Sequence, residues 1–360
     1  MENPFFAFLI FILILFFYIH VTAQWKTSDD LEIYESDYES PSQLQEICAV
    51  KQPVVFKFQK DKSVDAFFER FQSAKFEKYD NIDIRIKDRQ DYNKPGNTGE
   101  TYDSVDYVPL SFRSARRLMT TDTTAKYFSE KNHFFLEENG LDRLSRSLDS
   151  ILKPPLSVYS KYDILLGSPL VATPLRYHLE SHKFIAVTRG SIRMKLCPPK
   201  YSKIIPVNRD YENYEFWSHL DPWTTSSSSM SSPTDILQKT KFLDIEVNTG
   251  DVLFIPPYWW YSISFSGDPL TTVATFTYDV AMNIVAQSKH WALFYLQQSN
   301  IKTRPAKTMV LSEDGKSEAP LVTSEIESSS DSKTTEIDEK NKTDRGNKEI
   351  VTNAGTYIVG

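Results

Sequence analysis

The sequence predicts a mainly β domain with flanking helices, preceded by an apolar N-terminal helix and followed by a polar tail. Aromatic residues make up 13% of the chain and only 11 of its 360 residues are glycine, which suits a β or α+β core packed by aromatic rings. Short apolar or alternating runs bounded by turn residues recur between residues 53 and 278, as is typical of strands. Residues 1–23 and 301–360 depart from this pattern.

Residues 1–23 are predicted to form a membrane helix. Residues 5–21 are an almost unbroken apolar and aromatic run, and about 17 to 25 residues are needed to span a bilayer. The small residues before Gln24 also fit a signal peptide cleaved after Ala23. We therefore expect a single-pass membrane protein of the endomembrane system or secretory pathway, or its secreted form after cleavage at Ala23.

The rest of the chain divides into a predicted linker at 24–44, a main domain at 45–300 and a disordered tail at 301–360. The tail has too few apolar residues to offset its ordering entropy. Apolar spacing predicts helices at 41–48, 64–76, 111–128, 141–152 and 282–297. Strands are expected at 53–58, 82–86, 133–136, 163–168, 184–187, 192–196, 242–247, 252–255, 258–265 and 271–278, with another strand at 176–178.

Composition argues against several classes of protein. A net charge of −7 and an acidic isoelectric point disfavour a nucleic-acid surface, which needs a basic face. The two cysteines, Cys48 and Cys197, are far apart and form no zinc or disulfide framework pattern.

Residues 210–223 interleave aromatic and acidic side chains, and are expected either to cover the barrel mouth as a lid or to pack as an ordered connection.

Two segments carry the most specific signal. Residues 173–178 read T-P-L-R-Y-H, and residues 250–261 read G-D-V-L-F-I-P-P-Y-W-W-Y. They resemble segments of the JmjC/cupin-like oxygenases, the asparaginyl-hydroxylase branch in particular, which read T-P-x-H-Y-D and G-D-x-L-x-I-P-x-x-W-W-H. Gly190 and the two prolines at 198–199 fit as well. The resemblance covers about residues 45–300 and implies a double-stranded β-helix, the cupin or jelly-roll fold.

The resemblance places the iron ligands of that family at Arg176, His178 and Tyr261. Two histidines and a carboxylate normally hold Fe(II) and leave positions open for 2-oxoglutarate and oxygen. Arginine has no lone pair to donate, and tyrosine is a poor ligand until it is deprotonated. We therefore interpret these three as vestigial metal-site positions and predict no bound cofactor. The co-substrate lysine of the family aligns with Ile192. Further pocket candidates are Thr173, Tyr177, Glu180, Ile192, Lys195 and Trp259.

A second hypothesis places a metal one pleat further along. His178, Glu180 and His182 alternate, so on a strand they would share one face and supply nitrogen and oxygen ligands. The competing interpretation, which we favour, is that the charges on this face pair with one another, because Tyr261 stands where the second segment should supply a ligand.

Together these patterns predict a membrane-attached cupin-like protein that lacks 2-oxoglutarate/Fe(II) oxygenase activity and acts by binding or scaffolding. Its partner is expected to be an unknown protein or a small anionic ligand held by Arg176. The alternatives are a protein hydroxylase that uses Fe(II) and 2-oxoglutarate with displaced ligands, or a cupin that uses another metal. In the family, a helix like that at 282–297 often supports dimers, so a homodimer through this helix is expected.

Overall fold

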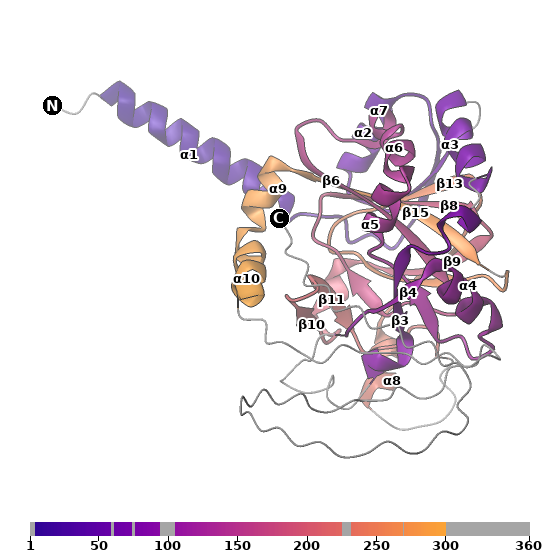
Figure 1. Ribbon diagram of the computed structural model, residues 1–360. Coiled ribbons are helices and arrows are strands. Elements are labelled where there is room, and N and C mark those ends of the chain that lie inside the picture. Colours follow the sequence, from indigo (N-terminus) through magenta and orange to yellow (C-terminus); the bar gives the residue numbers. More distant parts are fainter. Residues whose placement is uncertain are drawn as a thin grey trace, which may run out of the picture. The chain divides into compact units, whose positions relative to one another are not determined.

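The computed structural model describes residues 4–58, 61–73, 76–93, 105–224, 232–268 and 270–299 (Figure 1). The predicted disordered tail at 301–360 lies outside these residues. The described chain forms two β-sheets with helices at their margins.

The larger sheet has the order β1-β2-β13-β8-β15-β6-β5-β3-β4 within the described residues. Its strands in that order are Tyr34–Asp37, Val54–Lys57, Asp251–Ile255, His182–Arg189, Thr271–Val280, Ser157–Gly167, Tyr127–Ser129, Asp83–Asp88 and Val108–Ser111. The second sheet has the order β10-β11-β7-β14-β9-β12. Its strands in that order are Asn208–Asp210, Glu215–Ser218, Leu175–Tyr177, Trp260–Phe265, Ser191–Cys197 and Leu243–Asn248. The neighbours β13-β8-β15-β6 and β7-β14-β9-β12 form the two facing sheets of a double-stranded β-helix, which confirms the predicted fold.

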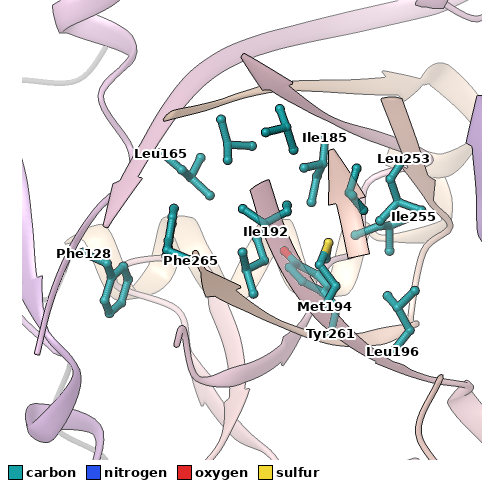
Figure 2. Close-up of a cluster of buried hydrophobic side chains, with 14 of the residues drawn as sticks. Phe128, Leu165, Ile185, Ile192, Met194, Leu196, Leu253, Ile255, Tyr261 and Phe265 are labelled. Carbon is teal, nitrogen blue, oxygen red and sulfur yellow. The ribbon is translucent and has the colours of Figure 1, made fainter. Parts of the chain in front are cut away.

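Apolar side chains from both sheets meet inside the barrel (Figure 2). Ile185 of β8 and Leu253 of β13 come from the larger sheet, and Ile192 and Tyr261 come from the second. The two sheets approach closely at Gly167, the last residue of β6, where an added Cβ atom would collide with the Phe265 ring. Glycine at this position lets the two sheets approach.

The helices are α1 (Pro4–Gln24), α2 (Pro41–Ala49), α3 (Lys62–Ser73), α4 (Phe112–Thr121), α5 (His133–Glu138), α6 (Leu141–Arg146), α7 (Asp149–Leu152), α8 (Ser232–Lys239), α9 (Ala281–Ala286) and α10 (Ser288–Ser299). Short 3₁₀ helices occur at η1 (Phe76–Tyr79), η2 (Arg89–Asn93) and η4 (Pro199–Lys203). Helix α3 packs on the larger sheet, where Phe67 meets Phe276 of β15 at a ring-centre distance of 5.7 Å. Helix α3 therefore covers an apolar residue of β15 that points away from the barrel interior.

Several sequence predictions are wrong in detail. The helix expected at 111–128 ends at Thr121 as α4, and strand β5 begins at Tyr127. The single helix expected at 282–297 is interrupted at Gln287, between α9 and α10. The strand expected at 133–136 is helix α5, because Lys131 adopts a left-handed backbone with φ of 59° and ends the extended chain after β5. The single helix expected at 141–152 is divided into α6 and α7 by a break at 147–148.

The segment between α1 and the barrel is tied to the domain by hydrogen bonds. Lys51 Nζ donates to the Ala23 carbonyl oxygen at 2.8 Å, and Trp25 Nε1 donates to that of Ala286 at 3.2 Å. The indole of Trp259 donates to the Ser28 carbonyl oxygen at 3.1 Å. Strand β1 then pairs in parallel with β2. Residues 24–44, expected as a linker, therefore form part of the folded domain.

Candidate functional site

The three predicted metal-site positions meet at one end of the barrel. Arg176 on β7 lies directly opposite Tyr261 on β14 in antiparallel register. The guanidinium carbon is 5.6 Å from the centre of the Tyr261 ring, and the His178 ring is 5.9 Å from the same ring. All three side chains are largely shielded from solvent. Trp259 and Tyr261 belong to the inner cluster whereas Trp260 packs on the outer face, as strand alternation predicts.

Arg176 is held by a buried ion pair. Its Nη1 lies 2.6 Å from Oε2 of Glu130, which directly follows β5 of the larger sheet. Burial, the largest single effect, disfavours the charged guanidinium, but Glu130, Tyr261, Tyr92 and Glu215 together outweigh it and raise the pKa of Arg176 above its ordinary range. Arg176 is therefore a permanent cation at the position where the resemblance puts a metal-binding imidazole.

A second buried ion cluster centres on Glu215, the first residue of β11. Lys87 Nζ lies 2.8 Å from both of its carboxylate oxygens, and Lys131 Nζ lies 2.6 Å from one of them. The hydroxyl of Tyr107 donates to the same carboxylate at 2.6 Å. Burial alone would raise the pKa of Glu215, but Lys131 and Lys87 hold it well below its usual range. Two cations thus share one carboxylate.

The short segment after β5 orients both ion clusters. Glu130 reaches Arg176, and the next residue, Lys131, reaches Glu215. The backbone N–H groups of Lys131 and Asn132 each donate to the Asp163 carboxylate at 2.6 Å. These bonds stabilise the left-handed backbone of Lys131, a conformation that is unfavourable for residues other than glycine.

His178 is buried, and neither of its ring nitrogens has a hydrogen bond of ordinary geometry to a described residue. Burial, reinforced by the neighbouring Lys183 ammonium, lowers the pKa of His178 well below its usual value. The ring is therefore neutral at physiological pH. Lys183 itself points into the barrel, with its Nζ 5.8 Å from the Tyr261 ring centre.

These donors do not fit the Fe(II) site of the oxygenases. Arg176 is paired with Glu130, and among the three positions only His178 offers a neutral nitrogen. Within the described part of the chain, no group of three or more His, Cys, Asp or Glu side chains is arranged to hold a metal ion.

The strand proposed for the displaced metal site is absent. Strand β7 ends at Tyr177 and β8 begins at His182, so His178, Glu180 and His182 do not lie on one strand. The His182 ring packs 5.5 Å from that of Phe254, away from the inner cluster, and burial lowers its pKa to about 4. Glu180 accepts a hydrogen bond from the Leu179 N–H at 3.2 Å. The alternation argument for a shared face is therefore wrong.

The remaining pocket candidates separate between the two faces of the second sheet. Ile192 and Trp259 belong to the inner cluster. Thr173 has a structural role, because its hydroxyl accepts from the Ile263 N–H at 2.9 Å. Tyr177 and Lys195 lie on the outer face: the Tyr177 ring packs 4.8 Å from Trp260, and Lys195 Nζ lies 5.3 Å from the Trp223 ring. These two residues do not line the inner site.

The segment expected as a lid or a packed connection is ordered against α10. The Tyr214 ring stacks on Trp291 at 5.0 Å, and the Tyr211 hydroxyl lies 3.0 Å from Nδ1 of His290. Sequence reasoning missed the charged residues that dominate the site, Lys87, Glu130, Lys131, Lys183 and Glu215. Only Lys183 had a local signal, since it alternates with the inward residues Ile185 and Val187.

Residues 40–284 match the family described as the cupin-like domain, and the chain therefore belongs to that family. A search of curated proteins found no match to this chain. The family match confirms the resemblance and the fold that were predicted from the two motifs.

Proposed function

We propose that this protein is a membrane-attached cupin-like domain without 2-oxoglutarate/Fe(II) oxygenase activity, which acts by binding or scaffolding. The observation that carries the proposal is the Arg176–Glu130 ion pair, 2.6 Å long, at the position of the first iron ligand of the family. A metal cation placed beside Arg176 would be repelled by the guanidinium and would gain no donor from it. No cofactor is expected.

The membrane attachment rests on α1. Residues Phe5–Gln24 have a mean hydropathy of 2.6, and their side chains are not covered by the rest of the described chain. By length and composition this helix suits either a membrane anchor or a signal sequence. We favour the anchor because the helix runs through the cleavage site predicted after Ala23, whose carbonyl is bound by Lys51. An endomembrane location follows from this choice.

The predicted homodimer through residues 282–297 remains part of the proposal. Helices α9 and α10 span most of this segment, and Tyr295 and Leu296 are 65% and 64% exposed. A second copy that packs against this face would bury both side chains. Replacement of Leu296 by Glu should convert the dimer to a monomer in light scattering of the detergent-solubilised protein. An unchanged mass would exclude this interface.

Metal analysis of the purified full-length protein tests the central proposal. After incubation with Fe(II) and gel filtration, we expect substoichiometric metal and no release of succinate from 2-oxoglutarate. A matched variant with Arg176→His, His178→Asp, Tyr261→His and Glu130→Gln restores the ligand types and should retain more iron than the natural chain. Stoichiometric iron with succinate release from the natural chain would establish the hydroxylase alternative instead. Another tightly held transition metal would establish the other-metal cupin.

A further inference from the structure

Two lysines flank a threonine in one row across three neighbouring strands. Thr277 of β15 pairs with Lys161 of β6 on one side and with Lys183 of β8 on the other. Each of the three lies an even number of residues from an inner-cluster residue on its own strand: Leu165, Val273 and Ile185. Side chains two positions apart on a strand share a face, so the row faces the barrel interior near Tyr261.

This row brings positive charges together. Among the described residues, no carboxylate lies within ion-pair distance of Lys161. Lys131 and Lys183 act on it repulsively, and Asp163 and Glu180 act on it attractively from further away. Asp163 and Glu180 form no ion pair with the row among the described residues, and each accepts backbone hydrogen bonds: Asp163 from the Lys131 and Asn132 N–H groups, and Glu180 from that of Leu179. A cationic side chain that is shielded from water usually has an anionic partner.

Buried polar atoms without partners occur at the same end of the barrel. They are Nε of Arg176 and Oε1 of Glu130, together with the His178 ring, whose contact with the Ile255 backbone falls short of ordinary hydrogen-bond geometry. His178 and Glu130 are each 5% exposed, so bulk water does not readily satisfy them. Arg176 and His178 both lie beside Tyr261, and Lys183 lies beside the same ring. The lysine row and the unpartnered atoms therefore belong to one polar region.

We propose that this region binds an oxyanion, a carboxylate or a phosphate, between Lys161 and Lys183 with Thr277 as a hydroxyl donor. The inference deepens the proposed binding function and rests on it. The site lies on β6, β15 and β8, whereas the resemblance places the co-substrate lysine of the oxygenases at Ile192 on β9, an apolar residue of the inner cluster. The two lysines that recognise the anion therefore come from other strands than the co-substrate lysine that the resemblance implies.

Thermal unfolding of the detergent-solubilised full chain in EDTA tests the site. Potassium succinate and potassium phosphate are titrated against potassium chloride of equal ionic strength, and isothermal calorimetry gives the affinity. A ligand that binds only the folded state raises the unfolding temperature. We expect saturable stabilisation of the natural chain by at least one oxyanion, and the comparison of the two salts distinguishes carboxylate from phosphate.

Lys161→Gln and Lys183→Gln should each weaken this binding by about tenfold or more, the effect of losing a charged hydrogen-bond donor. Lys161→Arg keeps the charge and should retain most of the affinity. Lys153→Gln, at an exposed position, should behave like the natural chain. Circular dichroism checks that each variant folds. If a glutamine variant does not fold, the affinity of Lys161→Arg is compared with that of the natural chain instead.

Two results would overturn the inference: stabilisation by neither oxyanion beyond that of chloride, or equal affinity in the natural chain and both glutamine variants. Iron content and succinate release are measured on the same preparation. Iron-dependent release of succinate by this preparation would exclude the proposed non-catalytic function. Absence of anion binding in iron-free protein would exclude only the oxyanion site.

Discussion

The Arg176 guanidinium and the Glu130 carboxylate, 2.6 Å apart, join the two sheets of the barrel. Arg176 lies on β7 of the second sheet, and Glu130 follows β5 of the larger one. The pair therefore fixes the position of one sheet relative to the other at the end of the barrel where Arg176, His178 and Tyr261 meet.

Removing one partner of this pair should destabilise the fold strongly. Arg176→Met leaves the Glu130 charge buried without its cation, which typically costs about 3–5 kcal/mol. The double variant Arg176→Met, Glu130→Met should lose less stability than the sum of the losses in the two single variants, because it leaves no buried charge without a partner. Urea denaturation of the four proteins measures this cycle, and additive losses would contradict an energetically coupled pair.

Asp279 should make stability fall as the pH rises from about 4 to about 7. Burial raises its pKa to about 7, whereas an unfolded aspartate has a pKa of about 3.9. Between these values the unfolded chain releases the proton and the folded chain keeps it, so ionisation favours unfolding. Asp279→Asn keeps an Oδ1 acceptor for the Ser181 and Val280 N–H groups. The stability of this variant relative to the natural chain should increase with pH across this window, and a constant difference would contradict the assignment.

Two truncations should distinguish the anchor from the folded domain. Deletion of residues 1–20 removes only exposed side chains among the described residues, so the unfolding temperature should stay within a few degrees while membrane partitioning is lost. Deletion of residues 1–38 also removes β1 and the Ser28 carbonyl that binds Trp259, so it should lower the unfolding temperature clearly. Equal unfolding temperatures for the two truncations would show that this segment contributes nothing to the fold.

Gly167→Ala should destabilise the barrel by about 1–3 kcal/mol, the usual cost of overpacking a core. The added methyl group would collide with the Phe265 ring, which cannot move without disturbing the inner cluster. Gly267→Ala is the matched control, because an added Cβ there meets nothing within 4 Å. Denaturation curves that shift equally for both variants would contradict the close approach of the two sheets at Gly167.

The sequence was most informative where strands are central. Alternation predicted that Trp259 and Tyr261 share the inner face. The strands expected on either side of Gly190 appear as β8 and β9, but the hairpin expected there is wrong, because β8 pairs with β13 and β15 in the larger sheet and β9 pairs with β12 and β14 in the second. The alternation of His178, Glu180 and His182 misled because the chain turns between β7 and β8. Two-residue periodicity indicates a shared face only if the strand continues, and nothing in this short stretch marks where it ends.

The ion clusters could not be predicted because their partners are distant in the chain. Glu215 is 128 positions from Lys87, and neither residue occurs in a distinctive motif. Their meeting depends on strand order, which places β11 beside β7 and β3 beside β5. The sequence therefore indicated that Arg176 occupies a position where the resemblance implies a metal ligand, but not which carboxylate compensates its charge.

The left-handed backbone at Lys131 has a consequence for how this region tolerates length changes. It lets consecutive side chains, Glu130 and Lys131, reach different ion pairs while the same backbone is bound to Asp163. Inserting or deleting a single residue there would rotate both charges away from their partners at once. Sequence changes in this stretch should therefore be restricted to substitutions that preserve chain length, even though the connection between a strand and a helix usually accepts insertions and deletions.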